Sequence, residues 1–118
     1  MNFRLYLLQR ASAALMLPLI LGHLAIIFYA TSQKLTAADI LGRTEGNLGW
    51  AAFYGLFVLL VAVHGAIGFA TIAREWFGLG GRGQTALMWG VGLVLVALGL
   101  RAVLAVVYPG GGFFGGAA

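Results

Sequence analysis

The stretch GNLGWAAFYGLFVLLVAVHGAIGFATIA occupies residues 46–73 and contains no Lys, Arg, Asp or Glu. A helix needs about 20 mostly apolar residues to cross a bilayer, so this stretch is long enough to form a transmembrane helix. Two further stretches, residues 11–33 and 83–100, also lack these charged residues. Hydrophobic residues make up 62% of the 118 positions and charged residues 8%, a balance typical of membrane proteins. The sequence therefore predicts three transmembrane helices.

The fold class expected from this pattern is an all-α membrane protein that forms a single transmembrane domain. The expected spans cover residues 9–29, 50–73 and 85–108. Pro18 should bend the first span, because it removes one backbone donor. The polar connection that follows should contain a short interfacial helix started by Thr36. A glycine-rich turn joins the second and third spans, Pro109 should stop the third, and the tail at 109–118 is expected to be flexible.

Composition excludes several classes of site. Cysteine is absent, so this chain can hold no disulfide, thiolate metal site or iron–sulfur cluster. The net charge of +4 comes from scattered basic residues and is too small for a nucleic-acid surface. The first apolar stretch is about 20 residues long, which exceeds the 7–15 residues or so of a signal-peptide core, and we expect it to remain in the mature protein.

The basic residues predict the topology. Arg4 and Arg10 precede the first span and Arg74 and Arg82 follow the second, whereas Lys34 and Arg43 in the intervening connection are offset by two acidic residues. The positive-inside rule then places the amino terminus in the cytoplasm and the carboxyl terminus outside.

Small residues are frequent in the second and third spans. Such positions let helices approach closely in lipid, and three helices bury little surface on their own. We therefore expect this chain to be part of a larger helical bundle with a second membrane chain. The glycines concerned are Gly55, Gly65, Gly68, Gly90, Gly92 and Gly99.

Two histidines, His23 and His64, lie in separate apolar spans. An imidazole within lipid is costly unless something binds it, and haem is the common large prosthetic group held by paired imidazoles in membranes. Gly68, one turn from His64, and Gly22, beside His23, would let a flat macrocycle approach the helix backbone. The alternative is that each histidine bonds a carbonyl or hydroxyl of a neighbouring helix and that the glycines serve packing.

The depth of the two histidines favours two haems. At about 1.5 Å per residue, His23 lies roughly 4 Å to the outer side of the middle of its span and His64 roughly 3 Å to the inner side of its own. Two ligands of one upright haem should lie at nearly equal depth. A separation of about 7 Å is more consistent with two stacked haems, each with one ligand from this chain and one from another.

Several short motifs resemble those of a known family. They are Leu8-Gln9-Arg10-Ala11-Ser12-Ala13-Ala14-Leu15 at the start of the first span, His23 late in it, His64-Gly65-Ala66-Ile67-Gly68 in the second, and Arg74-Glu75-Trp76 after it. In these motifs and in the number and order of its spans, the chain resembles the small cytochrome b membrane-anchor subunits of succinate dehydrogenase and fumarate reductase, the succinate:quinone oxidoreductases. The resemblance covers about residues 6–108.

The resemblance implies roles for particular residues. His64 matches the axial haem b ligand of the family's second helix. His23 matches the additional ligand that two-haem members carry in the first helix. Arg10 and Ser12 match the family's R-x-[ST] motif, whose arginine pairs with haem propionates or lines the quinone site, although Arg10 could equally serve as a topology anchor.

Two further residues depart from the family pattern or extend it. Many members have a quinone-binding tyrosine after the second helix, and here Trp76 stands in that neighbourhood with an indole N–H as its only donor. Arg101 lies inside the third span and could pair with a propionate of the outer haem or extend to the interface.

The implied complex is an enzyme in the bacterial or archaeal cytoplasmic membrane, with a flavoprotein subunit, an iron–sulfur subunit and a second membrane anchor. This chain would bind haem b and quinone and would pass electrons between the iron–sulfur subunit and quinone, with no catalytic side chain of its own. One rival is a one-haem anchor in which His64 alone binds haem. The other is a haem-free three-helix assembly factor or transporter component.

Overall fold

In the computed structural model the described residues, 3–109, form four helices and no strand. The helices are α1 (Phe3–Ser32), α2 (Ala37–Thr44), α3 (Leu48–Phe77) and α4 (Gly81–Val107). Of these, α1, α3 and α4 are long and apolar enough to cross a membrane. The predicted all-α fold with three candidate membrane spans is therefore confirmed. The part of the expected tail at 110–118 lies outside the described residues.

The three long helices extend beyond the apolar cores from which they were predicted. Both α1 and α3 have 30 residues, which corresponds to about 45 Å at 1.5 Å per residue. A hydrocarbon layer is about 30 Å thick, so the helix ends reach into the interface. α1 remains a single helix through Pro18. α4 begins earlier than expected, at Gly81, and ends before the Tyr108–Pro109 pair, since the residue that precedes a proline disfavours helical geometry.

Local capping residues set the helix boundaries on either side of the connections. Thr36 caps α2, as predicted: its side chain accepts from the backbone N–H of Asp39, and the Asp39 carboxylate accepts from the N–H of Thr36. These bonds, led by the backbone bond from Thr36, hold the pKa of Asp39 below its usual value. α3 ends at Phe77 and is capped by Gly78, whose φ of 68° is a left-handed conformation that glycine adopts without strain.

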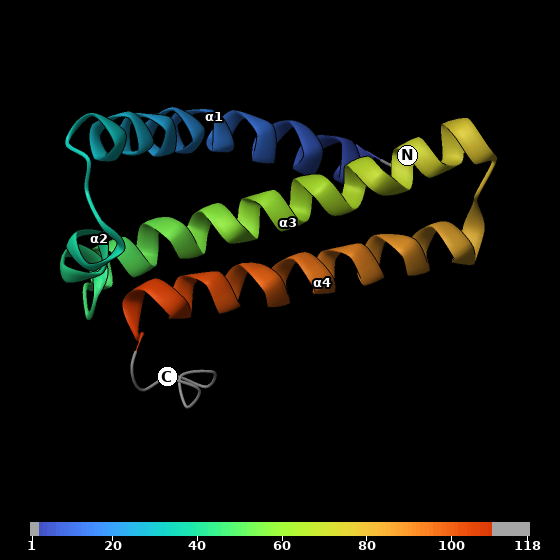
Figure 1. The fold of residues 1–118 in the computed structure, drawn as a ribbon. Helices are drawn as coiled ribbons and strands as arrows, with labels where there is room; N and C mark the ends of the chain where they lie inside the picture. Colours follow the sequence, from blue (N-terminus) through green and yellow to red (C-terminus); the bar gives the residue numbers. More distant parts are fainter. Residues whose placement is uncertain (1–2, 110–118) are drawn as a thin grey trace.

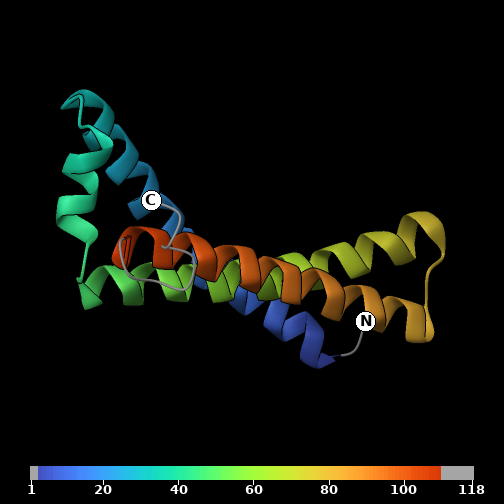
Figure 2. The same ribbon diagram turned by 60° about the horizontal axis from the view of Figure 1, so that its bottom comes forward.

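α3 is the central helix of the bundle. Figure 1 shows α3 between α1 and α4, and Figure 2 shows α1 crossing the α3–α4 pair at an angle while α2 stands across one end. The most buried residues of α3 are small or aliphatic and include Ala62, Ala66 and Ala70. By contrast, only 6% of the most apolar window of α1 is buried. Most of the α1 surface is thus left for lipid or another chain.

Glycines bring α3 and α4 together. A methyl group added at Gly99 would overlap Val58, and one added at Gly65 would lie 2.9 Å from Cδ1 of Leu95. Gly92 lies against the methyl group of Ala66, 3.4 Å from the position of an added Cβ. Small residues therefore allow close approach between two helices of this chain, and the association with a second membrane chain expected from them stays a prediction.

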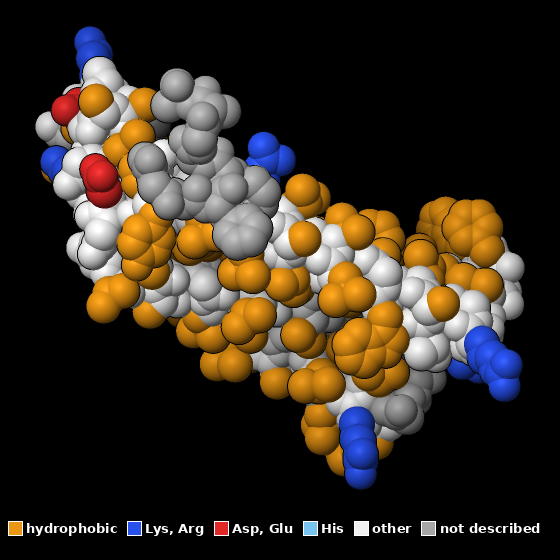
Figure 3. All heavy atoms as spheres, turned by 90° about the horizontal axis from the view of Figure 1, so that it is seen from below, with side chains coloured by type: hydrophobic (Ala, Val, Ile, Leu, Met, Phe, Trp, Pro, Cys, Tyr) orange, Lys and Arg blue, Asp and Glu red, His pale blue; other side chains and the backbone are white. Residues whose placement is uncertain are grey.

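The two ends of the bundle differ in charge. We call the end with α2 the α2 end, and the end where residues 78–80 join α3 to α4 the turn end. Figure 3 shows a face covered by hydrophobic side chains, with charged side chains near its ends and edges. The turn end carries Arg4, Arg74 and Arg82 with one acidic residue, Glu75, whereas at the α2 end Lys34 and Arg43 are matched by Asp39 and Glu45.

We expect Gly99→Ala to lower the free energy of unfolding by about 1–3 kcal/mol, because the added methyl overlaps a stiff β-branched Val58 side chain. Gly90→Ala on the same helix is the matched control, since nothing lies within 4 Å of its Cβ position. The alanine at 90 should be neutral or stabilising by up to about 1 kcal/mol. Unfolding of the full chain in micelles, followed by tryptophan fluorescence, measures both. Equal effects would contradict the described α3–α4 contact.

Candidate functional site

His64 projects from the middle of α3 toward the first half of α1. Its Nδ1 lies 3.4 Å from the backbone oxygen of Gln9 and 3.4 Å from Oγ of Ser12. The Ser12 hydroxyl donates its own proton to the same Gln9 oxygen, at 3.0 Å. A carbonyl oxygen can only accept, so the imidazole proton that satisfies this geometry is on Nδ1.

This arrangement leaves Nε2 of His64 as the unprotonated nitrogen. Nε2 has no hydrogen-bond partner in the described part of the chain, and the side chain is half-buried. Metal-binding histidines commonly donate one ring N–H to an oxygen that fixes the ring, and coordinate through the other nitrogen. His64 has this form, with a buried Ser12 as one of the two oxygen partners.

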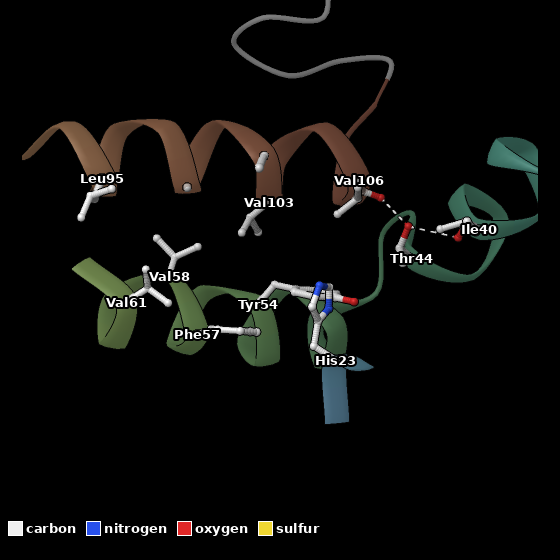
Figure 4. Close-up of a pocket in the computed structure, with 12 residues that line it drawn as sticks. His23, Ile40, Thr44, Tyr54, Phe57, Val58, Val61, Leu95, Val103 and Val106 are labelled. Atoms are coloured by element: carbon white, nitrogen blue, oxygen red, sulfur yellow. Dashed lines mark hydrogen bonds between the residues drawn. The ribbon is translucent and has the colours of Figure 1, made fainter. Parts of the chain in front are cut away.

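His23 lies at a different place, on α1 beside the first half of α3. Its ring is nearly perpendicular to the rings of Tyr54 and Phe57, with centroids 5.8 and 5.6 Å away. Its Nδ1 is buried and has no hydrogen-bond partner among residues 3–109. Figure 4 shows His23 at the edge of an apolar cavity of about 430 Å³ between α3 and α4. The histidine thus offers a nitrogen that this chain alone does not satisfy.

The two imidazoles are too far apart to bind one metal ion. His23 follows Ser12 by 11 residues on α1, and Tyr54 and Phe57 precede His64 by ten and seven residues on α3. At about 1.5 Å per residue the rings are separated by roughly 10–16 Å along the helices. This exceeds the distance of about 7 Å expected from the sequence, and two nitrogens on one metal would be only about 4 Å apart.

A metal cage made by this chain alone is absent from the described residues, which contain no group of three or more His, Cys, Asp and Glu side chains. Each histidine could therefore supply one ligand. Such a site requires a prosthetic group that carries its own metal donors, a ligand from another chain, or both.

Each glycine beside a histidine has one side chain of this protein as a close neighbour. A Cβ at Gly68 would lie 3.4 Å from Nε2 of Gln9, and a Cβ at Gly22 would lie 3.6 Å from the ring of Phe53. Both glycines therefore have packing neighbours within this chain, and their contact with a flat macrocycle stays a prediction.

The remaining predicted site residues lie away from the histidine contacts. The Arg10 guanidinium is exposed and lies 5.7 Å from the centroid of the Tyr6 ring. Trp76 is 77% exposed at the turn end. Arg101 is exposed on α4 and does not line the cavity beside His23. The structure thus brings together His64, Ser12 and Gly68 of the predicted set.

Gln9 is the residue that sequence reasoning missed at His64. Its backbone oxygen accepts from the histidine, its amide covers Gly68, and its Oε1 is buried without a partner among the described residues. The available signal was a polar residue three positions before Ser12, which places both on one face of a helix.

A second cavity, of about 320 Å³, lies at the turn end and has a more polar lining. Thr71, Arg74 and Gln84 line it, and the Gln84 amide donates to the backbone oxygen of Ala70 at 3.2 Å. Sequence analysis did not identify Gln84, because its position opposite α3 depends on how the turn pairs the two helices.

Comparison with known proteins finds no match, either to a family model or to a curated protein or solved structure. The residues and their geometry therefore carry the functional proposal.

We predict that His64 has its proton on Nδ1, which ¹⁵N NMR of histidine-labelled chain in lipid would show as one protonated and one unprotonated ring nitrogen. Ser12→Ala removes one acceptor of the Nδ1 proton, and a hydrogen bond is worth about 0.5–1.5 kcal/mol. The ratio of the Nδ1–H to the Nε2–H tautomer should therefore fall about two- to tenfold. Ser32→Ala is the matched control, because Ser32 also donates to the carbonyl three residues before it and lies far from His64 in the sequence. An Nε2–H signal in the unsubstituted protein would contradict the geometry.

Proposed function

We propose that this chain is a haem b-binding membrane anchor of a succinate:quinone oxidoreductase. The observation that carries the proposal is the His64 ring, fixed through Nδ1 by Ser12 and Gln9 with Nε2 left for a metal. The family motifs around Arg10, Ser12 and His64 supply the reaction class. The apolar helices support a membrane location.

The residues fit two haems better than one. His64 and His23 lie at different levels of the bundle, and each has a ring nitrogen without a partner in the described chain. Each histidine would supply one axial ligand, with the second from a partner anchor. The sparsely buried α1, which carries His23 and contacts His64 through Ser12, supports such a partner on this side of the bundle.

When bound, haem supplies one-electron transfer at a potential that axial ligands and surroundings set. The contribution of this chain would be to hold the imidazoles, to keep the His64 proton on Nδ1, and to exclude water with apolar side chains. The basic turn end would face the cytoplasm by the positive-inside rule and would meet the iron–sulfur subunit, to which the flavoprotein is bound.

Quinone binding would involve the turn-end cavity. Its polar residues Arg74 and Gln84 can donate hydrogen bonds to a quinone carbonyl, whereas the indole of Trp76 lies on the exposed surface outside the residues that line the cavity. We therefore favour Arg74 and Gln84 over Trp76 as the quinone contacts from this chain.

One observation favours the haem-free alternative for part of the site. The contacts of His64 Nδ1 with Gln9 and Ser12 are also those expected of a histidine that only joins two helices. The two functions differ at Nε2, which a structural histidine leaves empty and a haem ligand occupies.

The test is the haem content of the complex purified through a tag on this chain. We expect b-type bands in dithionite-reduced minus oxidised spectra, two haems per copy, and the loss of one haem in either His64→Ala or His23→Ala. Gel quantification of the assembled subunits separates haem loss from failure to assemble.

Each contrary result has a defined meaning. An assembled complex without b-type bands would rule out the cytochrome function and leave the assembly factor or transporter component. Full haem content and two redox transitions in assembled His23→Ala would rule out the two-haem version.

A further inference from the structure

Two cavities meet at His23. One is the apolar cavity between α3 and α4, with a volume of about 430 Å³. The other, distinct from the turn-end cavity, has about 450 Å³ and lies between α1, α2 and the start of α3. His23, Ile40, Thr44 and Tyr54 line both. The space around the imidazole therefore continues from the interior of the bundle to the underside of α2.

α2 is fixed above this space by hydrogen bonds to α4. The Thr44 hydroxyl lies 2.7 Å from the backbone oxygen of Val106, and the N–H of Gly46 donates to the backbone oxygen of Val107 at 2.7 Å. The capping box at Thr36 holds the other end of the helix in shape. The position of α2, and of the side chains it carries, is thus defined by the fold.

Arg43 is the cation that α2 places at this cavity. Its guanidinium lies 5.4 Å from the centroid of the Tyr29 ring, and both residues line the cavity beside His23. The charge of Arg43 helps to lower the pKa of Asp39, four residues earlier. No ion pair joins Arg43 to an acidic group in the described chain. Neither Lys34 nor Arg101 lines this cavity.

The position of His23 indicates which end its ligand would face. His23 is nine residues from the end of α1 at Ser32 and 20 residues from its start at Phe3, or about 14 Å and 30 Å along the helix. A haem on His23 carries two carboxylates that must reach water or a cation, and the α2 end is the nearer surface.

We infer that Arg43 binds a haem propionate at the His23 site, so that α2 forms part of the haem-binding site. This inference rests on the proposed function. A guanidinium is always charged and matches a carboxylate with two parallel hydrogen bonds. Arg43 replaces Arg101, the residue expected from the sequence to make this contact.

The test is a redox titration of the intact complex that carries Arg43→Gln, compared with Arg101→Gln and Lys34→Gln. A nearby positive charge favours the reduced haem, which has one positive charge fewer. We therefore expect Arg43→Gln to shift the midpoint potential of the His23 haem downward while the haem count and the His64 transition stay unchanged. Arg43→Lys should give a smaller shift, because it keeps the charge and loses the two-pronged geometry.

Assignment of the transitions uses the same substitutions in the His64→Ala background, where the remaining b-type haem is the one on His23. A shift in Arg101→Gln but not in Arg43→Gln would overturn the inference and restore Arg101. Equal shifts in all three variants would show a general effect of charge at the α2 end and would also overturn it. Two haem transitions with no response to Arg43→Gln overturn this inference alone, whereas the absence of b-type bands overturns the proposed function with it.

Discussion

A polar atom within hydrocarbon has no water to bind, so each such atom needs a partner from the protein or from a ligand. This constraint explains why α1 and α3 meet where they do. The meeting point joins the Gln9 carbonyl, the Ser12 hydroxyl and the His64 imidazole. The same constraint makes the unpartnered Nδ1 of His23 informative, because its burial is unfavourable in a chain that stands alone.

The bundle divides into two parts with different kinds of contact. α3 and α4 pack closely at glycine and alanine positions, where side chains of one helix contact the glycines of the other and gain dispersion energy. α1 crosses α3 at an angle, and its contact with α3 includes the polar group at Ser12. Close helix packing therefore lies on one side of α3, and the polar contacts of the candidate haem ligand His64 lie on the other.

Local signals were sufficient to predict the elements of the fold. Uninterrupted apolar stretches predicted three spans, and Thr36 predicted the start of α2, because these features depend on neighbours in the sequence. The contacts of the site were harder to predict. Gln9 beside His64 and Tyr54 beside His23 depend on the rotation and axial offset of α1 against α3, which distant residues set.

The uneven burial of the helices has a consequence for biogenesis. The α3–α4 hairpin can reach its final form soon after insertion, whereas α1, with 6% of its apolar window buried, has little to hold it except the crossing at Ser12 and the connection through α2. In the proposed complex, α1 would be the part of the chain most open to membrane proteases until the second anchor binds. Cellular levels of this polypeptide would then follow the synthesis of that proposed partner, because excess chain would be degraded.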